Sequence, residues 1–460
     1  MIHKVISRRD LLKATALGSG AAFLAACAPQ ATAVPAAAPA TAVPAAAAAT
    51  AVPVAAAPPA KVDITLDAVT DLTGKPEMWA EMFNELKEKT GVTINVNKIP
   101  FSEVETKMLT AVAGGVQPDL TMGHPMMNST FGFKQLLVDM TPYIEKEKYD
   151  LTTLFPGAVK ALSYGGKTYG LPYSFNVLLY YYNKKTIVAA GMEDPYEVWK
   201  AGKWNFETFV KYGDDISRGE GKDQIFSITE PPKTSRVQLS MLRGFGGEIW
   251  TEDLKKVVID SPESLEGWEF MADHVRKGWS PAAAGRDQQY QPTMTPLFNN
   301  NQLAIYLNNR GFTSSFDLKL IDPGMIPYPL WPNGKSITRC VGEGLTAMVG
   351  TEYADAIWEC NKFWSTRGHE ILLAGGGSAP NGPGPLASAD WQKALAPWEK
   401  NDVYLEAFDS GIPDNLPPGF GEQDKICQSF YDEVALGKRS AKEAMGDARV
   451  KMQEVLNEYL

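Results

Sequence analysis

The stretch VDITL at residues 62–66 alternates apolar and polar side chains, as a half-buried β-strand does, and it opens the part of the sequence that decides the fold. The same alternation returns in VTINV at 92–96, and PDLTM at 118–122 begins a third short strand. Apolar residues at helical spacing fill the two intervals and predict helices over 74–90 and 102–113. This β-α-β-α-β order predicts an α/β fold with a largely parallel sheet, whose ligands usually bind at the carboxyl ends of the strands.

The remainder of the chain also mixes strands and helices. Ser102, with Glu105 three residues on, is predicted to cap the helix at 102–113. An apolar run at 177–182, which includes three consecutive tyrosines, predicts a buried strand, because β-sheets favour tyrosine. Further helices are predicted over 205–217, 262–277, 352–365, 388–401 and 440–460.

Length and composition limit the class of protein. The 460 residues are 44% hydrophobic and 21% charged, which indicates a globular body, and the length predicts two domains or lobes. A net charge of −10 disfavours nucleic acid as a partner, because phosphate is bound by cationic surfaces. Four histidines and four cysteines are too few and too scattered for a metal cluster or a disulfide scaffold, so no metal and no cofactor is expected.

The first 26 residues have the features of an export signal. Arg8 and Arg9 precede a weakly apolar run at 14–26, and about 13 apolar residues are too few to cross a hydrocarbon core of about 30 Å. The arginine pair resembles a twin-arginine signal. The run ends in LAAC at 24–27, which resembles the lipobox of bacterial lipoproteins. Residues 1–26 are therefore predicted to be a signal peptide, and Cys27 the lipidated first residue of the mature chain.

Residues 27–60 are predicted to be a tether. After Cys27 they contain 18 Ala, 7 Pro and no charge, and the pentamer ATAVP recurs at 31–35, 40–44 and 49–53. Proline every few residues prevents a continuous helix and favours extended polyproline II segments. The sequence thus predicts an extracytoplasmic protein that is held at the cell membrane by its lipid alone, without a membrane-spanning helix.

Four motifs occur in an order that resembles the extracellular solute-binding proteins of bacterial ABC importers, the family that contains maltose-binding protein. They are AGGVQPDL at 113–120, YGLPY at 169–173 leading to YNK at 182–184, Trp204 with Phe206 and Phe209, and a helix at 354–365 that contains KFW at 362–364. Together they extend over most of residues 61–385. The predicted lipidated and tethered amino terminus agrees with this resemblance.

The resemblance implies a periplasmic-binding-protein-like fold, in which two α/β lobes joined by crossing hinge segments close on a solute. By analogy the chain crosses near 172–175, 342–345 and 386–391. Residues 61–174 and 345–388 then form the N-lobe, and residues 175–344 and 389–460 the C-lobe. Gly342 and Gly344 fit a hinge, because glycine absorbs large changes in backbone dihedrals.

The same resemblance implies a monomeric receptor that binds a sugar or oligosaccharide between its lobes, delivers it to the membrane subunits of an ABC permease and does no covalent chemistry. Two alternatives stay open. One is a receptor of the same fold for a polyamine or for ferric iron, the latter held by tyrosine hydroxyls. The other is a secreted carbohydrate-active hydrolase, which requires two carboxylates about 5–10 Å apart.

Sugar recognition requires aromatic rings against C–H faces and planar polar groups against hydroxyls, and loops after the predicted strands supply both. His124 and Asn128 follow the strand at 118–122. Glu230 lies in TEPP at 229–232, which resembles a Gln-Glu-Pro segment whose acid binds sugar hydroxyls in the family. The full set of candidate ligand-binding residues is His124, Asn128, Tyr173, Phe175, Asn176, Glu230, Asn309, Arg310, Phe312 and Phe420.

Arg310 bears on the class of solute. A guanidinium that points into the cleft pairs with a planar anion and favours an acidic sugar. A guanidinium that points outward leaves a neutral oligosaccharide as the expectation.

The three cysteines that remain after lipidation are Cys340, Cys360 and Cys427. Buried free thiols are favoured over a Cys340–Cys360 bridge, since a body that folds in the cytoplasm before export rarely forms disulfides.

Overall fold

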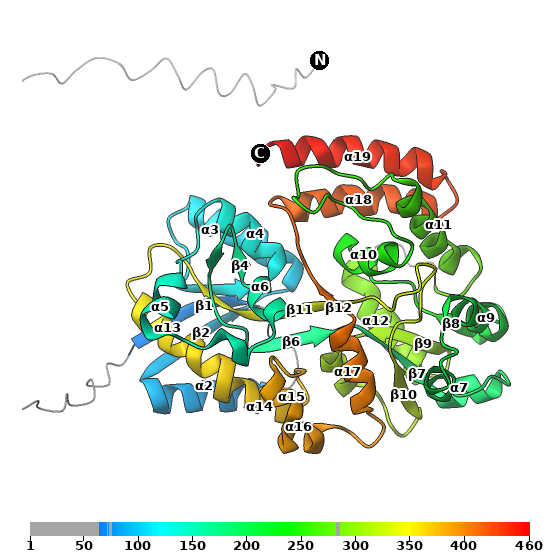
Figure 1. The fold of residues 1–460 in the computed structure, drawn as a ribbon, viewed down its shortest axis with the longest axis horizontal. Helices are drawn as coiled ribbons and strands as arrows, with labels where there is room; N and C mark the ends of the chain where they lie inside the picture. The colour runs from blue at the N-terminus through cyan, green and yellow to red at the C-terminus, as the bar shows by residue number, and fades with distance from the viewer. Residues whose placement is uncertain (1–63, 71, 73–75, 282–285) are drawn as a thin grey trace, which may run out of the picture. The chain divides into compact units, whose positions relative to one another are not determined.

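Two β-sheets organise the described part of the chain, which in the computed structural model comprises residues 64–70, 72, 76–281 and 286–460, without the side chains of 286–292. The predicted signal peptide, the tether and Cys27 lie outside these residues. The first sheet has the strand order β12-β11-β3-β1-β2, with β6 also paired to β11, and the second has the order β10-β7-β9-β8 (Figure 1). A short hairpin is formed by β4 and β5.

The first sheet contains the strands predicted at the start of the folded body. β1 pairs in parallel with both β2 and β3, and a helix follows each of β1 and β2, so the predicted β-α-β-α-β unit is confirmed. The strands are β1 (Ile64–Thr70), β2 (Val92–Lys98), β3 (Leu120–Gly123), β4 (Ser163–Tyr164), β5 (Lys167–Thr168), β6 (Ser174–Val177), β7 (Leu179–Asn183), β8 (Phe226–Ile228), β9 (Leu303–Asn308), β10 (Pro323–Ile326), β11 (Thr338–Ala347) and β12 (Gly411–Pro413).

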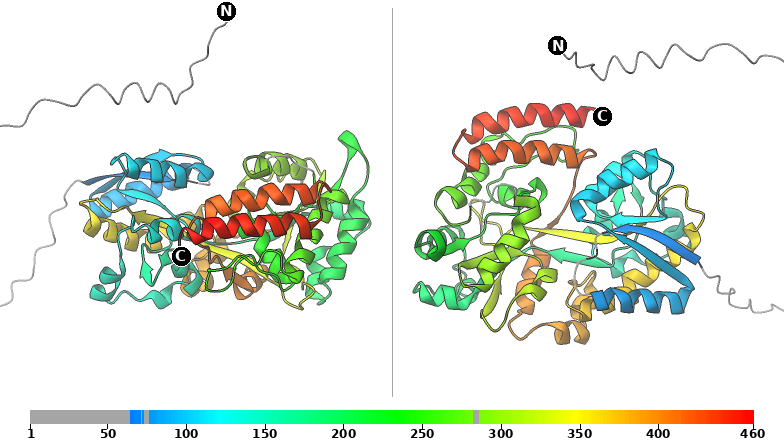
Figure 2. Two further views of the ribbon diagram at one scale, coloured as in Figure 1. Left: turned by 90° about the horizontal axis from the view of Figure 1, so that it is seen from above. Right: turned by 180° about the vertical axis from the view of Figure 1, so that it is seen from behind.

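Helices cover both sheets, and we call each sheet with its helices a lobe. In the first lobe, α3 and α4 lie on one side of the sheet, and α2 and α13 on the other (Figures 1 and 2). The helices of the first lobe are α2 (Pro76–Thr90), α3 (Phe101–Ala113), α4 (Pro125–Phe133), α5 (Thr141–Glu147), α6 (Pro156–Ala161), α13 (Ala354–Phe363) and α14 (His369–Ala374), with the 3-10 turn η1 (Leu151–Thr153) and the π-helical turn η4 (Trp364–Gly368).

The second lobe is the more helical one. Figure 2 shows α18 and α19 side by side, and α11 packs against both of them. Its helices are α7 (Lys184–Ala189), α8 (Pro195–Lys200), α9 (Phe206–Ile216), α10 (Ser235–Gly244), α11 (Pro262–Arg276), α12 (Arg286–Asn299), α17 (Asn401–Asp409), α18 (Phe420–Ala435) and α19 (Ala441–Asn457), with the 3-10 turns η2 (Gly221–Asp223) and η3 (Arg310–Ser315). The short helices α15 (Pro383–Ala387) and α16 (Ala389–Ala394) connect α14 to α17.

Capping residues place many helix ends where the sequence predicted them. The side chain of Asn205 accepts from the backbone of Thr208 at the start of α9, and Ser440 and Glu443 form a full capping box at α19. The predicted Ser102 cap of α3 is wrong. Pro100 is the N-cap, because its extended backbone lets the helix begin at Phe101 and leaves Ser102 inside the first turn.

Two other predicted elements are divided in the structure. The single helix expected at 388–401 is wrong, since α16 ends at Ala394 and α17 begins at Asn401, and Pro397 between them cannot donate the backbone hydrogen bond of a helix interior. The strand expected at 177–182 is also divided. β6 belongs to the first sheet and β7 to the second, and Leu178 between them donates its N–H to the carbonyl of Arg339.

The tyrosine run of β7 lies in the core. Tyr180, Tyr181 and Tyr182 are at most 1% exposed, with Tyr180 and Tyr182 in one hydrophobic cluster and Tyr181 in another. The hydroxyl of Tyr182 donates to Asp194. The predicted buried strand is therefore confirmed for these three residues, and the run packs rather than lines a surface.

Gly342 and Gly344 lie within β11, where their lack of a side chain admits neighbouring backbone. A Cβ on Gly342 would stand 2.6 Å from the carbonyl oxygen of Ala158 in α6, and one on Gly344 would stand 2.9 Å from that of Leu171. β11 therefore approaches α6 and the segment at Leu171 more closely than any residue with a side chain permits.

The described cysteines are free and buried, which confirms the predicted thiols. Cys340 and Cys360 lie in separate hydrophobic clusters. Burial raises the pKa of each of these two thiols to about 12, so both stay protonated and unreactive at neutral pH.

Two buried histidines make the stability of the protein depend on pH. The Nδ1 of His369 lies 2.7 Å from the carbonyl oxygen of Tyr173, and its Nε2 accepts from the backbone N–H of Asn381 at 3.3 Å. The Nδ1 of His274 lies 3.1 Å from the carbonyl oxygen of Phe270. Burial lowers the pKa of both histidines from 6.5 to about 4. Each ring is thus neutral in the folded state at pH values where the unfolded chain binds a proton.

Because the folded pKa lies below the unfolded one, this stabilisation is fully present above about pH 6.5 and is lost as the pH falls toward 4. We expect the free energy of unfolding, measured by urea titration, to fall progressively between pH 6.5 and 5, where most carboxylates have not yet titrated. The double variant H274F/H369Q should have a flatter slope over the same interval. An unchanged slope in that variant would contradict the assignment.

Candidate functional site

The first lobe brings His124 to the boundary between the lobes. β3 ends at Gly123, and His124 follows as the N-cap of α4, where its Nδ1 accepts a 3.1 Å hydrogen bond from the backbone N–H of Met126. The ring is 1% exposed and packs edge-on against Phe101 of α3, with centroids 5.0 Å apart. The carboxyl end of a parallel strand is where α/β sheets present ligand-binding groups.

The second lobe places Arg236 opposite His124. Arg236 lies in the first turn of α10, with its Nη1 3.5 Å from the Nε2 of His124 and its guanidinium carbon 5.2 Å from the ring centroid of Phe101. Burial, together with the charges of Arg236 and Arg339, holds the pKa of His124 well below 6.5. Burial and the charge of Arg339 lower the pKa of Arg236 to about 10. At neutral pH the histidine is therefore neutral and the arginine charged.

Asp424 of α18 supports Arg236 indirectly, by capping its helix. Its Oδ1 accepts hydrogen bonds of 2.6 Å from both the backbone N–H and the hydroxyl of Ser235, and its Oδ2 accepts one of 3.0 Å from the hydroxyl of Thr234. Thr234 is the N-cap of α10 but offers no capping bond of its own. A carboxylate from another helix thus fixes the start of α10. Burial raises the pKa of Asp424, and its hydrogen bonds together with the charge of Arg236 offset part of that rise.

A second contact between the lobes involves α4 and the segment before α18. The hydroxyl of Ser129 donates to the carbonyl of Pro417 at 3.2 Å, and the backbone N–H of Gly419 donates to the hydroxyl of Thr130 at 3.2 Å. Gly419 has φ +69°, and a Cβ there would stand 2.5 Å from the ring of Tyr459. The left-handed backbone and the close approach of Tyr459 therefore require glycine at that position.

Other predicted site residues of the first lobe serve its interior. Asn128 is fully buried, and its amide donates to the carbonyl of Ala161 at 3.0 Å. Tyr173 is 3% exposed and packs edge-on against Trp79, with centroids 5.5 Å apart. Both side chains pack within the first lobe.

The two predicted residues on β6 diverge, as neighbours on a strand do. Phe175 stacks on Phe408 of α17 with centroids 5.7 Å apart. Asn176 is 7% exposed, and its amide lies 3.5 Å from the hydroxyl of Ser174, which in turn donates to Glu343 at 3.1 Å. The polar face of β6 therefore carries Ser174 and Asn176.

Glu230 and Phe420 are both fully buried in the second lobe. Glu230 follows the end of β8 by two residues, whereas His124 follows β3 directly. The ring of Phe420 packs against Trp250, with centroids 5.8 Å apart, in the hydrophobic cluster that also contains α19. The structure thus places Phe420 in the core and Glu230 at a strand end.

Arg310 points neither into a cleft nor outward. Its Nε donates to Glu399 at 2.9 Å, its Nη1 donates to the carbonyl of Ser378 at 2.9 Å, and its side chain is 3% exposed. Asn309 caps the turn η3 by accepting from the backbone of Gly311 at 3.0 Å, and Phe312 within that turn is partly exposed. The structure thus uses the Arg310 guanidinium inside the protein, away from Arg236.

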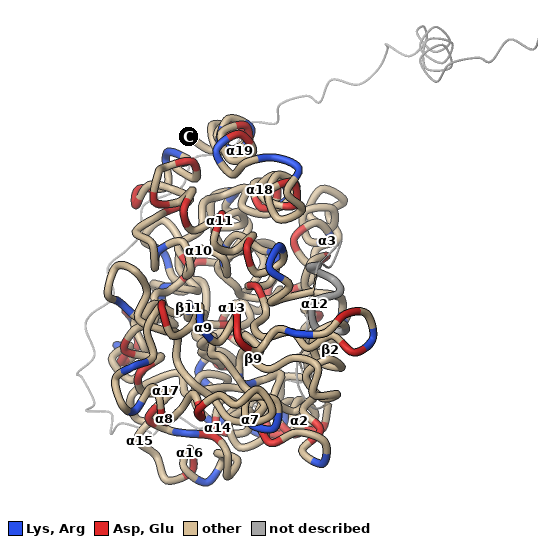
Figure 3. Tube along the Cα trace, turned by 90° about the vertical axis from the view of Figure 1, so that its right-hand side faces the viewer, with Lys and Arg blue, Asp and Glu red and all other residues tan. Residues whose placement is uncertain are grey.

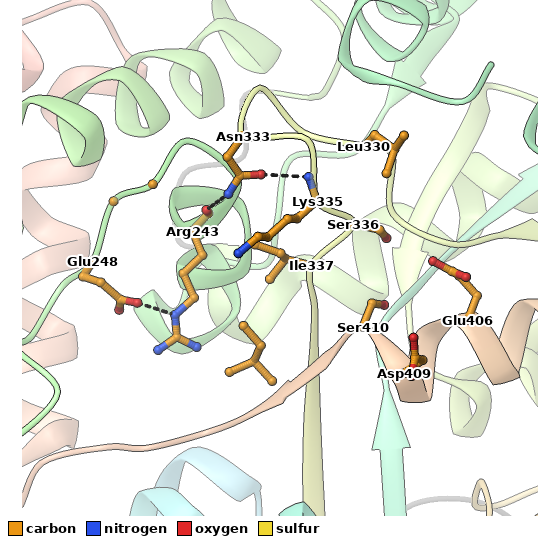
Figure 4. Close-up of a pocket in the computed structure, with 13 residues that line it drawn as sticks. Arg243, Glu248, Leu330, Asn333, Lys335, Ser336, Ile337, Glu406, Asp409 and Ser410 are labelled. Atoms are coloured by element: carbon orange, nitrogen blue, oxygen red, sulfur yellow. Dashed lines mark hydrogen bonds and ion pairs between the residues drawn. The ribbon is translucent and has the colours of Figure 1, made fainter. Parts of the chain in front are cut away.

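A separate pocket of about 690 Å³ lies beside β12 and contains none of the predicted site residues (Figure 4). Arg243 is paired with Glu248 at 2.7 Å, and Asn333 donates to the carbonyl of Arg243 at 2.7 Å. The lining residues are Arg243, Gly246, Gly247, Glu248, Leu330, Asn333, Lys335, Ser336, Ile337, Glu406, Asp409, Ser410 and Ile412. This lining has no aromatic ring, whereas a sugar site stacks C–H faces on aromatic rings, so the boundary at His124 is the stronger candidate.

Of the residues that meet at this boundary, the sequence predicted His124 but not Phe101, Arg236 or Asp424, and Glu230 stays a prediction. The signal for Arg236 was weak, since a cation in the first turn of a helix usually faces solvent. Phe101 directly precedes the helix predicted at 102–113, and nothing in that local pattern gives its ring a role. A β-strand end in one lobe and a helix start in the other, 112 residues apart in the chain, meet only through the tertiary fold.

Basic and acidic residues are interspersed over the side of the molecule shown in Figure 3. Across residues 64–70, 72, 76–281 and 286–460, no cluster of three or more His, Cys, Asp or Glu side chains is arranged to bind a metal ion. In the same residues no helix combines the length and apolar character needed to cross a membrane.

Comparisons with known proteins identify the family. A profile of the family described as bacterial extracellular solute-binding protein matches residues 70–368. The maltotriose-binding protein of Pyrococcus abyssi is 24% identical over 314 residues, which are 65% of this chain, and the chain spans 64% of the length of that relative.

Solved structures share the fold. The ABC substrate-binding protein Lmo0181 of Listeria monocytogenes, in complex with cycloalternan, has a TM-score of 0.76 at 21% identity, with 86% of this chain and 100% of that chain covered. The maltose-bound MalE3 of T. maritima has a TM-score of 0.71 at 19% identity, with 85% of this chain and 100% of that chain covered. The predicted two-lobed periplasmic-binding-protein-like α/β fold is confirmed. Because the profile covers more than half of the sequence, the chain belongs to the family of bacterial extracellular solute-binding proteins.

Proposed function

We propose that this protein is the solute receptor of an ABC importer, which binds a sugar or oligosaccharide between its two lobes and delivers it unaltered to a membrane permease. The observation that carries the proposal is the meeting of His124 and Phe101 from the first lobe with Arg236 and Asp424 from the second. An aromatic ring and planar polar groups at one boundary are the combination that a sugar requires.

The mechanism is one of differential contact. A solute that touches both lobes stabilises the closed arrangement over the open one, and its binding free energy determines how far the equilibrium moves. The segments that connect the two sheets, including the break between β6 and β7 at Leu178, supply the pivot. No covalent step is proposed.

The remaining proposals rest on the sequence. We propose that Cys27 carries the lipid and that residues 27–60 tether a monomeric receptor outside the cell membrane. Divided by sequence range and not by sheet, the lobes are proposed to comprise 61–174 with 345–388 and 175–344 with 389–460. Glu230, Asn176, Asn309 and Phe312 stay proposed as ligand-binding residues, since loops at strand ends and at the lobe boundary supply the contacts. Similarity to proteins whose structures contain cycloalternan or maltose supports a saccharide as the solute.

A thermal-shift panel tests the proposed function. The protein should melt at a higher temperature with at least one saccharide among maltotriose, cycloalternan, galacto-oligosaccharides and uronate oligomers. The rise should grow with concentration and reach a few degrees near 100 times the Kd, where binding contributes about 2.7 kcal/mol. Spermidine, amino acids and ferric iron complete the panel.

The matched variants are Phe101→Ala at the boundary and Tyr353→Ala, which removes an exposed aromatic residue of the same lobe. The first should reduce the saccharide-induced rise and the second should preserve it. The proposal fails if spermidine or iron alone shifts the melting temperature, or if a saccharide is cleaved during incubation.

A further inference from the structure

The hydrogen bonds of His124 fix which of its ring nitrogens carries the proton. A backbone N–H can only donate, so the Nδ1 that accepts from Met126 at 3.1 Å has a free lone pair. The neutral ring then carries its single proton on Nε2. His124 therefore presents an N–H donor, and not an acceptor, to the second lobe.

The group facing that donor is another donor. Arg236 has five N–H groups and no acceptor, and its Nη1 lies 3.5 Å from the Nε2 of His124. Two N–H groups that face each other across the lobe boundary do not form a hydrogen bond. Both N–H groups can instead donate to one oxygen atom that lies close to the two of them.

The rest of the Arg236 guanidinium also lacks an acceptor. Its Nε is buried without a hydrogen-bond partner, and over the described ranges of the chain no carboxylate forms an ion pair with it. The surrounding acids have other partners: Asp424 accepts from Thr234 and Ser235, Asp414 pairs with Arg339, and Glu343 accepts from Ser174. A buried donor without an acceptor costs about 1–3 kcal/mol, and more when it is charged.

We infer that a carboxylate of the solute is the missing acceptor, so that the receptor selects an acidic saccharide such as a uronate-containing oligosaccharide; this rests on the proposed function. The planar guanidinium fork matches a carboxylate, and the Phe101 ring at 5.2 Å holds the fork in place by a cation–π contact. A carboxylate oxygen bound by both donors stands about 2.9 Å from each nitrogen. Since the two nitrogens are 3.5 Å apart, an oxygen beside the line that joins them satisfies both distances at their present separation.

This arrangement gives the carboxylate a role in closure. His124 belongs to the first lobe and Arg236 to the second, so an oxygen between them is held by both. Without it, two donors and one uncompensated positive charge meet at the boundary. The acidic group of the solute thus stabilises the closed arrangement more than a neutral group in the same position does.

The test is isothermal titration of the full chain at 150 mM salt with trimers of galacturonate, glucuronate and mannuronate. Each trimer is compared with its own methyl ester, which keeps the ring hydroxyls and removes the charge. At least one acid should bind 100-fold or more tightly than its ester. Arg236→Gln should remove most of this preference, Arg236→Lys should keep part of it, and Arg449→Gln, a matched loss of charge on α19, should keep all of it.

A second measurement separates a solute-binding role from a structural one. Because Arg236 has no acceptor in the folded protein, Arg236→Gln should leave the melting temperature of the solute-free protein unchanged or raise it. A large fall would mark Arg236 as structural and overturn the inference.

The remaining outcomes are also decisive. The inference is overturned if each uronate acid and its methyl ester bind equally. It is also overturned if neutral saccharides or sugar phosphates bind and no uronate does. Both outcomes are compatible with the proposed function. Failure of every saccharide, acidic or neutral, overturns both. An acid that binds Arg236→Gln as tightly as the unaltered protein overturns the inference alone.

Discussion

Replacing Asp414 by alanine is expected to lower the free energy of unfolding by about 3–5 kcal/mol, because it leaves a buried guanidinium without its anion. Asp414 pairs with Arg339, whose Nε lies 2.7 Å from Oδ1 and 2.9 Å from Oδ2, and the two side chains are 4% and 7% exposed. Arg339 lies on β11 and Asp414 directly after β12, so the pair joins two strands of the first sheet. The charge of Arg236 nearby also repels the unpaired Arg339 cation.

Urea unfolding followed by circular dichroism and tryptophan fluorescence measures this loss. Asp390→Ala is the matched control, since Asp390 pairs with Lys393 at 3.2 Å but is 86% exposed, and removal of an exposed pair changes stability by less than about 1 kcal/mol. The double variant R339M/D414L should recover much of the loss, because it removes both charges together. Equal losses in Asp414→Ala and Asp390→Ala would contradict the argument.

The local parts of the fold could be predicted from the sequence. Strand alternation at 62–66 and 92–96 and helical spacing at 74–90 correspond to β1, β2 and α2, because half-buried elements next to one core show their period directly. Sheet membership could not be predicted. β6 and β7 are separated by Leu178 alone, and the apolar run at 177–182 begins in one strand and continues into the other; only the pairing of β6 with β11 and of β7 with β9 and β10 divides them.

The candidate site shows the same division. His124 could be predicted from the sequence because it directly follows a predicted strand, and its position along that one element is local information. The partners of a charged side chain are not local. Arg310 pairs with Glu399, 89 residues on, which no spacing rule predicts, whereas Arg236 is left without an acid although acids surround it. The sequence named one arginine as the group that decides the class of solute, and the structure favours the other.

Replacing Arg310 by methionine should therefore reduce stability and not affinity. We expect the free energy of unfolding to fall by about 3–5 kcal/mol, because Glu399 would remain buried without its cation. Arg310 also donates to the carbonyls of Ala394, Ser378 and Leu373, at 2.5, 2.9 and 3.3 Å respectively. The hydroxyl of Tyr404 and the backbone of Ala396 would still donate to Glu399, at 2.6 and 2.7 Å, and would limit the loss without replacing the charge.

The comparison of Arg310→Met with Arg236→Gln decides between the two arginines. Urea unfolding should show a large loss for the first and none for the second, and titration with the preferred saccharide should show the reverse. Arg276→Met, which breaks a partly exposed pair with Glu269, controls for the loss of an arginine as such and should change neither quantity by much. A large fall in affinity for Arg310→Met, measured where the variant is fully folded, would return Arg310 to the binding site and contradict its assignment to the core. We expect the opposite because the Arg310 guanidinium already donates to four groups inside the protein and has no N–H left for a solute. The Arg236 guanidinium has no acceptor inside the protein, so its N–H groups remain available to a solute.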